Sequence, residues 1–325
     1  MFDLSFAGLS PDIILDAIET VDVQASSGLL ALNSYENRVY QFVAEDDKRY
    51  VAKFYRPQRW TNEQIQEEHD FALELAGDNV PVVAPLIING ASLHQHANYR
   101  FALFPSIGGR QFEVDNLSQL EWTGRLIGRM HKVAASKPFK HRPEFCTTDY
   151  LDTPKQVLLT GSLVPQHLQT ALHTILDQVI RETKSQFSNN YQSIRLHGDL
   201  HPGNILCGDG PTFVDLDDCR MGPAVQDIWM MLSGERQQQA IQLEKLIDAY
   251  NEFNEFDTEQ LSLIEPLRAA RMIHYMAWLT VRWEDPAFPN AFPWFAEDKY
   301  WENQIIGLKE QFLALQERPL QLHSK

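Results

Sequence analysis

The chain has 325 residues, of which 44% are hydrophobic, so it can bury a sizeable core and is long enough for two lobes. Its 28 Lys and Arg residues against 44 Asp and Glu residues give a net charge of −16, which argues against nucleic acid or an anionic membrane as a partner. No apolar segment approaches the roughly 20 residues of a membrane span, and the first residues lack the basic start of a signal peptide, so we expect a cytoplasmic protein.

The N-terminal third of the sequence predicts a small sheet that carries one helix. Thr61 and Gln64 form a capping box, and the helix that they open should run to about Ala76, with Gly77 as a left-handed cap. The four predicted strands have the alternation and the β-branched and aromatic content of half-buried strands. They are 38–43, 49–54, 80–86 and 98–104.

The period of the hydrophobic pattern changes to 3.6 after residue 105, which predicts a mostly helical remainder. The expected helices are 117–132, 163–186, 225–232, 237–253, 259–283 and 297–315. Embedded among them, residues 205–207 and 212–214 read as a short hairpin whose ends bring Asn204 beside Asp215. The Pro-rich stretch 285–294 is rich in Phe and Trp, which favours an ordered aromatic corner over a linker.

The segment from His197 to Asp215 carries the strongest functional signal. Asp199, then Asn204 five residues later, then Asp215 after a short strand, is the order in which a kinase fold holds a nucleophilic hydroxyl and Mg·ATP. The pattern His-Gly-Asp-x4-Asn would arise by chance in about two of a thousand chains of this length. We therefore predict that Asp199 orients and deprotonates the hydroxyl, and that the amide oxygen of Asn204 and the carboxylate of Asp215 bind Mg²⁺.

Lys53 lies on a predicted strand in the pattern Val-Ala-Lys, which is typical of the lysine that contacts the α and β phosphates of ATP. Such a lysine needs a carboxylate partner. At 100° per residue, Glu68 falls near the centre of the apolar stripe of the capped helix, and Glu67 falls at its edge. Because a carboxylate within an apolar stripe requires a partner, we predict the pair Lys53–Glu68, with Glu67 and a solvent-exposed Glu68 as the alternatives.

Two segments stand where a kinase fold contacts the rest of the nucleotide. Residues 33–37 occupy the position of a Gly-rich loop but contain no glycine, so the phosphates would be held by backbone N–H groups and the hydroxyl of Ser34. Residues 104–107 should form the hinge that holds adenine.

Four further residues allow two interpretations each. Asp227 could accept hydrogen bonds from the backbone around Asp199, or it could cap a helix. His197 fits a structural imidazole better than a general base. Asp217 and Asp218 could tune the metal site or could cap the next turn. Asp217 is the stronger candidate for the metal site, because strand alternation places it on the same inward side as Asp215.

Together these residues resemble the aminoglycoside phosphotransferase and choline kinase-like superfamily, which has a bilobal protein kinase-like fold. Within it, the chain is similar over nearly all its length to bacterial stress-related Ser/Thr protein kinases. The segments that carry the closer resemblance are Ala31–Tyr40, Lys53–Pro57, Phe104–Ser106, Gly109–Phe112 and Asp215–Asp218.

The resemblance implies an α+β fold with a small β-rich lobe at 1–105 and a larger helical lobe at 106–325. It implies Asp199 as the catalytic acid, Asn204 and Asp215 as Mg²⁺ ligands, and Ser34 at the ATP site. It also implies ATP-dependent phosphorylation of Ser or Thr in proteins, in a stress-protective role. We expect ATP and protein substrates as partners of a monomeric enzyme.

Two departures from eukaryotic protein kinases bear on this expectation. Gly198 replaces the Arg of His-Arg-Asp, so no basic side chain there can contact a phosphorylated activation loop, and constitutive catalytic geometry is the simplest inference. Few residues separate Asp215 from Val225, which leaves no long segment for peptide docking. Taken alone, that second departure favours a small-molecule hydroxyl substrate.

The leading hypothesis is thus a Ser/Thr protein kinase, and the resemblance decides it. The alternative is a kinase of a small alcohol such as an aminoglycoside, choline or homoserine. A nucleotide-binding pseudokinase is a third reading, but the intact set of Lys53, Asp199, Asn204 and Asp215 argues against it.

Overall fold

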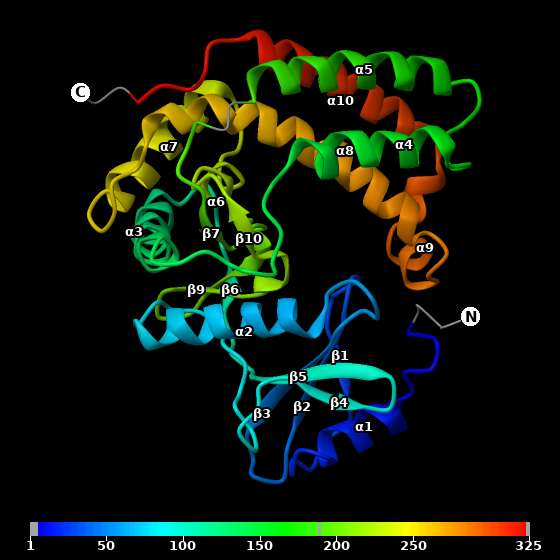
Figure 1. Cartoon of the computed structure of the whole chain (residues 1–325), viewed down its shortest axis with the longest axis vertical. Coiled ribbons are helices and arrows are strands. Elements are labelled where there is room, and N and C mark those ends of the chain that lie inside the picture. Colours follow the sequence, from blue (N-terminus) through cyan, green and yellow to red (C-terminus); the bar gives the residue numbers. More distant parts are fainter. Residues whose placement is uncertain (1–5, 188–189, 323–325) are drawn as a thin grey trace.

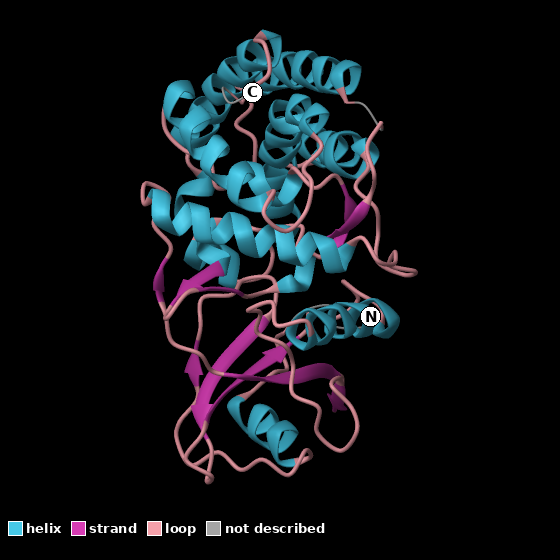
Figure 2. Ribbon diagram, turned by 90° about the vertical axis from the view of Figure 1, so that its left-hand side faces the viewer, coloured by secondary structure: helices cyan, strands magenta, loops and turns pink. Residues whose placement is uncertain are grey.

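The computed structural model describes residues 6–187 and 190–322 and has the mixed α+β architecture with two lobes that the sequence predicts. Figure 2 shows most of the strands in the lower part of the molecule and most of the helices in the upper part. The lower part is the β-rich N-terminal lobe, and the upper part is the helical C-terminal lobe (Figure 1).

A five-stranded antiparallel sheet forms the N-terminal lobe, in the strand order β1-β2-β3-β5-β4. Its strands are β1 (Leu30–Ala31), β2 (Arg38–Val43), β3 (Arg49–Phe54), β4 (His94–His96) and β5 (Tyr99–Pro105). In the central strand β3, Lys53 pairs with Val39 on one side and Ala102 on the other. The pairing of three strands therefore fixes the position of Lys53. Since β5 ends at Pro105, we propose the boundary between the lobes at 105–106.

Two helices accompany this sheet, whereas the sequence predicted only the second of them. α1 (Pro11–Glu19) packs at the outer end of the lobe, and α2 (Asn62–Gly77) lies between the sheet and the helical lobe (Figure 1). The predicted capping box is present, because the Thr61 side chain accepts from the N–H of Gln64 and the Gln64 side chain accepts from the N–H of Thr61. The helix that carries Glu68 thus begins where the sequence places it.

Two further expectations for this lobe are wrong, and one short strand was not predicted. Residues 80–86 form no strand, and only Val82 makes a bridge, with Phe213, because prolines at 81 and 85 remove ladder donors. The short strand β4 was not expected. Gly77 is the last residue of α2, and the left-handed residue is Asn79, with φ 58°. The N–H of Val80 then returns to the carbonyl of Leu75 at 2.9 Å, which closes the helix by a Schellman motif.

The C-terminal lobe contains eight α-helices within the described residues, of which six were expected. They are α3 (Leu117–Ala134), α4 (Thr153–Thr160), α5 (Gln169–Gln186), α6 (Gln226–Trp229), α7 (Arg236–Tyr250), α8 (Ile264–Arg282), α9 (Ala287–Ala291) and α10 (Asp298–Gln316). α5 begins six residues later than expected, after Pro165. α8 begins five residues later than expected, and Pro266 lies in its first turn, where a missing N–H costs nothing.

Short strands carry the functional segments of this lobe. They are β6 (Arg110–Gln111), β7 (Ile194–Leu196), β8 (Ile205–Cys207), β9 (Pro211–Phe213) and β10 (Arg220–Gly222). β8 and β9 form the predicted hairpin, and the N–H of Val214 donates to the carbonyl of Asn204 at 3.0 Å. β7 pairs with β10. The chain before Asp199 and the chain after Asp215 are therefore tied to each other.

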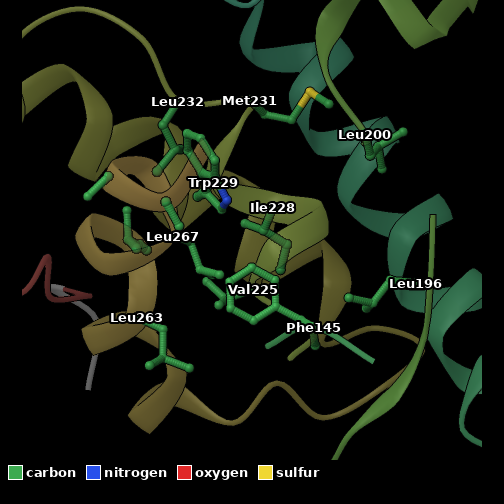
Figure 3. Close-up of a cluster of buried hydrophobic side chains, with 14 of the residues drawn as sticks. Phe145, Leu196, Leu200, Val225, Ile228, Trp229, Met231, Leu232, Leu263 and Leu267 are labelled. Atoms are coloured by element: carbon green, nitrogen blue, oxygen red, sulfur yellow. The ribbon is translucent and has the colours of Figure 1, made fainter. Parts of the chain in front are cut away.

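A hydrophobic core supports the segment that holds Asp199. Leu196 and Leu200 flank this residue and are fully buried. Figure 3 shows them in the same buried cluster as Phe145 and the α6 side chains Ile228 and Trp229. Because closely packed interiors resist displacement, the backbone on both sides of Asp199 has little freedom to move.

Among the described residues, no helix is both long enough and apolar enough to cross a bilayer.

The contact between α3 and α7 depends on two glycines, and substitution of one of them tests the packing. A methyl group at Gly128 would lie 2.5 Å from the carbonyl oxygen of Tyr250. We expect Gly128→Ala to lower the free energy of unfolding by about 2 kcal/mol, because the helices must separate. The control is Gly77→Ala, where a methyl group meets no atom within 4 Å and should stabilise α2 by about 0.5 kcal/mol. Equal stability of the two variants in urea unfolding would contradict this packing.

Candidate active site between the lobes

Lys53 is buried among three carboxylates that come from both lobes. Its ammonium nitrogen lies 3.1 Å from Glu68 Oε1, 3.1 Å from Asp215 Oδ1 and 3.2 Å from Asp217 Oδ1. Burial by itself would lower the pKa of Lys53, but the three carboxylates raise it well above the ordinary value. The lysine is therefore charged at neutral pH and ties the sheet to the segment after β9.

The predicted pair of Lys53 with Glu68 is present, and the alternative partner has another role. The second oxygen of Glu68 accepts from the Arg142 side chain at 2.8 Å, so this buried carboxylate bridges two cations. Glu67 instead accepts from the backbone N–H groups of residues 140–142 at 2.6 to 2.8 Å. Sequence spacing separated the two glutamates because one lies on the inner face of α2 and the other lies at its edge.

Asp199, Asn204 and Asp215 lie around one cavity at the end of the hairpin. The amide nitrogen of Asn204 donates to the backbone carbonyl of Asp199 at 2.9 Å, which leaves its amide oxygen available as a ligand. Asp215 has φ 61° and ψ 67°, a left-handed conformation that is costly for a residue with a side chain. Its side chain is 51% exposed although it contacts the buried Lys53. A strained, half-exposed carboxylate with a fixed neighbour is typical of a functional position.

Asp227 holds the backbone just before Asp199, so the first of its two readings is the observed one. Its two oxygens accept from the N–H of His197 at 2.7 Å and from the N–H of Gly198 at 2.9 Å. Asp227 is fully buried, and His131 Nε2 lies 3.1 Å from it. His197 is also buried, and its Nε2 donates to the carbonyl of Val214 at 2.9 Å, which fits the structural role expected for it.

Gly198 is required by its surroundings. Its φ is +86°, and a methyl group there would lie 2.2 Å from the carbonyl oxygen of Asp218. The same position therefore cannot carry the arginine of His-Arg-Asp.

Asp199 nevertheless has a basic neighbour, which the sequence did not reveal. Arg271, on α8, forms an ion pair with Asp199 Oδ1, and His201 Nε2 lies 3.5 Å from Asp199 Oδ2. The two paired residues are 72 positions apart, so no local pattern connects them. The constitutive catalytic geometry inferred from Gly198 stays a prediction, and the structure adds an arginine from another helix that contacts Asp199.

Asp217 and Asp218 are bound to arginines. Arg59 forms ion pairs with both carboxylates, and Arg220 lies 3.0 Å from Asp218 Oδ1. Burial would raise the pKa of each acid, but Arg59 holds both values below the ordinary range. Asp217 also contacts Lys53, which in turn contacts the candidate metal ligand Asp215. Neither Asp217 nor Asp218 is the N-cap residue of the turn at 216–218, because that position is Asp215. Arg59 is a second residue that sequence spacing missed.

The glycine-free loop 33–37 is anchored to the helical lobe through Glu36. Trp278 Nε1 donates to Glu36 Oε2 at 2.6 Å, and Arg282 Nη2 donates to Glu36 Oε1 at 2.9 Å. Arg56, from the chain just after β3, adds a contact to the same oxygen at 3.0 Å. Contacts with the helical lobe therefore hold this loop in one position, whereas a glycine-rich loop would be flexible.

An aromatic corner completes this anchor, as the stretch 285–294 predicted. Tyr35 lies edge-on to Phe292, with ring centroids 4.7 Å apart. Asp285 accepts from both Arg38 and Arg56, at 3.1 and 2.8 Å. The corner thus connects α9 to the loop and to strand β2.

Two cavities meet at this site. The first, of about 440 Å³, lies under the sheet and reaches Lys53, Ser34 and the segment 104–107. The second, of about 460 Å³, lies over Asp199 and is bounded on one side by α8. Asn33, Ser34, Gly203, Asn204 and Asp215 line both cavities. Ser34 therefore lies at the junction, together with the two candidate metal ligands.

Comparison with known proteins identifies the family. A model of the family described as "Phosphotransferase enzyme family" matches residues 29–264. This chain belongs to that family. It is 51% identical over 318 residues to stress response kinase A of Escherichia coli K12, a match that covers 98% of this chain and 97% of the relative. A relative from Salmonella typhimurium, 50% identical over the same coverage, is named serine/threonine protein kinase RdoA. As a member of this family, the protein is a kinase.

Solved structures of phosphotransferases share the fold at low identity. Amicoumacin kinase hAmiN, in complex with AMP-PNP, Ca²⁺ and Ami, has a TM-score of 0.69 and 19% identity, with 90% of this chain and 89% of that chain covered. A microcompartment-associated aminopropanol kinase has a TM-score of 0.74 and 17% identity, with 95% and 99% covered. The fold is thus that of the phosphotransferase family over nearly the whole chain.

The anchor at Glu36 should make stability depend on pH. Burial would raise the pKa of Glu36, but Arg59, Arg282 and Arg56 hold it below the ordinary value of 4.5. A lowered folded-state pKa contributes stability above pH 4.5, and that contribution is lost as the pH falls through the lowered value. We therefore expect Glu36→Gln to reduce the free energy of unfolding by about 2 kcal/mol at pH 7, and by less as the pH falls below 4.5.

Chemical denaturation at pH 7 and at pH 3.5 measures this difference. The control is Glu121→Gln, which removes an exposed pair with Arg125 and should change stability by less than about 0.5 kcal/mol. A Glu36→Gln penalty that is the same at both pH values would contradict the ionic anchor.

Proposed function

We propose that this kinase transfers the γ-phosphate of ATP to Ser or Thr hydroxyls of proteins. The observation that carries the proposal is the convergence of Asp199, Asn204 and Asp215 on one cavity, next to a second cavity that contains Lys53. One relative, 50% identical over nearly the full length, is named as a serine/threonine protein kinase, and this name supports protein hydroxyls as acceptors. The name of the Escherichia coli relative leads us to infer a stress-protective role. We also propose a cytoplasmic location, as the sequence led us to expect.

The first cavity is proposed as the ATP site. Lys53 would contact the α and β phosphates, and Glu68 holds its ammonium group in place. The adenine ring would bind at the segment 104–107, whose Ser106 hydroxyl accepts a hydrogen bond from Gln41 at 3.0 Å. The phosphates would reach the junction of the cavities, where backbone N–H groups of the loop 33–37 and the Ser34 hydroxyl are available.

Asn204 and Asp215 have the donors that a magnesium ion requires. Both offer hard oxygen ligands, and the hydrogen bond from Asn204 to the carbonyl of Asp199 uses the amide nitrogen, which leaves the amide oxygen available. Among the described residues, no group of three or more His, Cys, Asp or Glu side chains could hold a metal without help. This agrees with a site whose remaining ligands are ATP oxygens and water. When bound, Mg²⁺ neutralises the charge of the phosphates.

Asp199 would accept the proton of the acceptor. As the hydroxyl oxygen forms its bond to the γ-phosphorus, the bond from that phosphorus to the β–γ bridging oxygen breaks, and ADP leaves with the electron pair. The hydroxyl proton passes to the carboxylate of Asp199. The backbone contacts of Asp227 keep that carboxylate in register with the γ-phosphate.

A small alcohol is the second candidate acceptor. The second cavity is walled by α8 and by the loop 33–37, and its volume suits a drug-sized molecule. Solved structures with the same fold have the names of kinases of small molecules, which bears on the fold alone. The protein hydroxyl remains the leading proposal because the relative named as a serine/threonine protein kinase is 50% identical, far more similar than the small-molecule kinases at 17% and 19%.

Labelled ATP and Mg²⁺ test the proposal with a generic protein substrate and a panel of small alcohols. We expect label on Ser or Thr, and a fall in kcat of at least about 100-fold in Asp199→Ala. Asp215→Ala should abolish transfer through a loss on the order of several kcal/mol of transition-state stabilisation. Fluorescent ADP binding serves as the folding control.

Label on a small alcohol alone would replace the leading proposal by the second candidate. ATP binding without any transfer would refute both. Transfer at the wild-type rate by Asp215→Ala would refute its assigned role.

A further inference from the structure

One face of α8 forms a wall of the second cavity. Leu267, Arg271, His274 and Trp278 all line it, at the spacing of four, three and four residues that places side chains on one helical face. Two of these residues, about two helical turns apart, contact different functional groups. Arg271 forms an ion pair with Asp199, and Trp278 donates to Glu36 of the loop 33–37. An acceptor in this cavity would therefore lie along α8.

Three arginines line the second cavity, and two of them are held in ion pairs with aspartates. Arg59 is bound by Asp217 and Asp218, and Arg220 is bound by Asp218 and lies 5.2 Å above the Tyr150 ring. Their side chains are only 15% and 11% exposed. Neither guanidinium is free to meet a ligand without breaking a buried ion pair, which is costly.

Arg271 differs from both in exposure and in partner. Its side chain is 39% exposed, and within residues 6–187 and 190–322 its carboxylate partner is Asp199. A guanidinium has five N–H donors in a planar fork that matches carboxylate and phosphate groups, so most of its donors are available. The cavity thus contains an accessible cation directly beside the proposed proton acceptor.

The ion pair also occupies the group that the reaction needs. Asp199 Oδ1 is engaged by Arg271, although an oxygen of this carboxylate must accept the hydrogen bond of the incoming hydroxyl. An acceptor that brings its own anion can bind the guanidinium in place of Asp199. Binding of the correct acceptor would then release the carboxylate at the moment when it is required.

We propose that Arg271 is a specificity-determining residue that binds an anionic group next to the acceptor hydroxyl, a side-chain carboxylate or a phosphate, and thereby frees Asp199 Oδ1. This inference rests on the proposed phosphotransfer function, and it applies to a peptide and to a small alcohol alike. It predicts Ser or Thr flanked by acidic or phosphorylated residues. Cationic acceptors, which the net charge of −16 would attract at long range, are disfavoured by Arg271.

Three peptides that differ only beside one Ser test the inference. Their flanking residues are Glu, phosphoserine or Gln, and each peptide is offered to the wild type, Arg271→Ala, Arg271→Lys and the exposed α5 control Arg181→Ala. For the wild type and the control, we expect kcat/KM to be about tenfold or more higher with an anionic flank than with Gln. Arg271→Ala should reduce this ratio to about one. Arg271→Lys should keep part of it, because the charge remains but the fork is lost.

The readout is the ratio between peptides, because a general loss of structure lowers all rates together and leaves the ratio unchanged. Thermal unfolding of each variant checks its folding. A wild type that does not distinguish the flanks, or a preference that survives in Arg271→Ala, would overturn the inference. A higher kcat/KM with phosphoserine than with Glu would identify phosphate as the anion, and the reverse would identify carboxylate.

Homoserine and a matched amino alcohol without the carboxylate are tested in parallel. If only small alcohols are labelled, the protein acceptor is refuted, yet a carboxylate preference that disappears in Arg271→Ala still supports the role of Arg271. If peptides are labelled without any effect of flanking charge, phosphotransfer to proteins stands and the role of Arg271 falls. The two failures are therefore distinguishable.

Discussion

The charge of Lys53 is the constraint on which the rest of the site depends. A buried ammonium group is tolerated only when carboxylates compensate for its lost hydration, and here they come from α2 and from the segment after β9. Removal of any one partner would leave charge uncompensated in the interior. The sheet, α2 and the end of the β8–β9 hairpin must therefore meet in one arrangement, and that arrangement places Asp215 at the junction of the two cavities.

A second layer of arginines extends this network across the lobes. Arg142 holds Glu68, and Arg59 holds Asp217 and Asp218. Because Glu68 belongs to the N-terminal lobe and Asp217 to the C-terminal lobe, neither lobe satisfies its buried charges alone. Relative movement of the lobes would have to break several ion pairs together, so these pairs hold the two lobes in one relative arrangement.

The parts of this site that the sequence predicted are local. The hairpin of β2 and β3, the capping box at Thr61 and the stripe that contains Glu68 all follow from patterns within one or two elements. The proximity of Asn204 to Asp215 follows from a hairpin of a few residues. The strand expected at 80–86 is absent because Pro81 and Pro85 cannot donate ladder hydrogen bonds, and this effect is also local.

The contacts that the sequence did not predict join distant elements at angles set by packing. Helix α8 packs along one wall of the second cavity. Only this packing brings Arg271 to Asp199, and Trp278 and Arg282 to Glu36. Periodicity identifies the buried face of such a helix but not the side chain that it faces. Charged residues on α8 therefore read as ordinary solvated positions until the tertiary structure is known.

The absence of glycine from the loop 33–37 follows from the same helix. A Gly-rich loop approaches phosphates by backbone flexibility, whereas this loop is fixed by the burial of Glu36 against Trp278 and Arg282 and by the contact of Tyr35 with Phe292. A fixed loop loses less conformational entropy when a nucleotide binds. On the proposed assignment of the cavities, the loop would also connect the two substrates, because the α8 face that anchors it is the face along which the acceptor would lie. An acceptor that displaces Arg271 would free Asp199, and one that displaces Trp278 would release Glu36 and so the loop 33–37. Helix α8 would thus couple binding in one cavity to binding in the other.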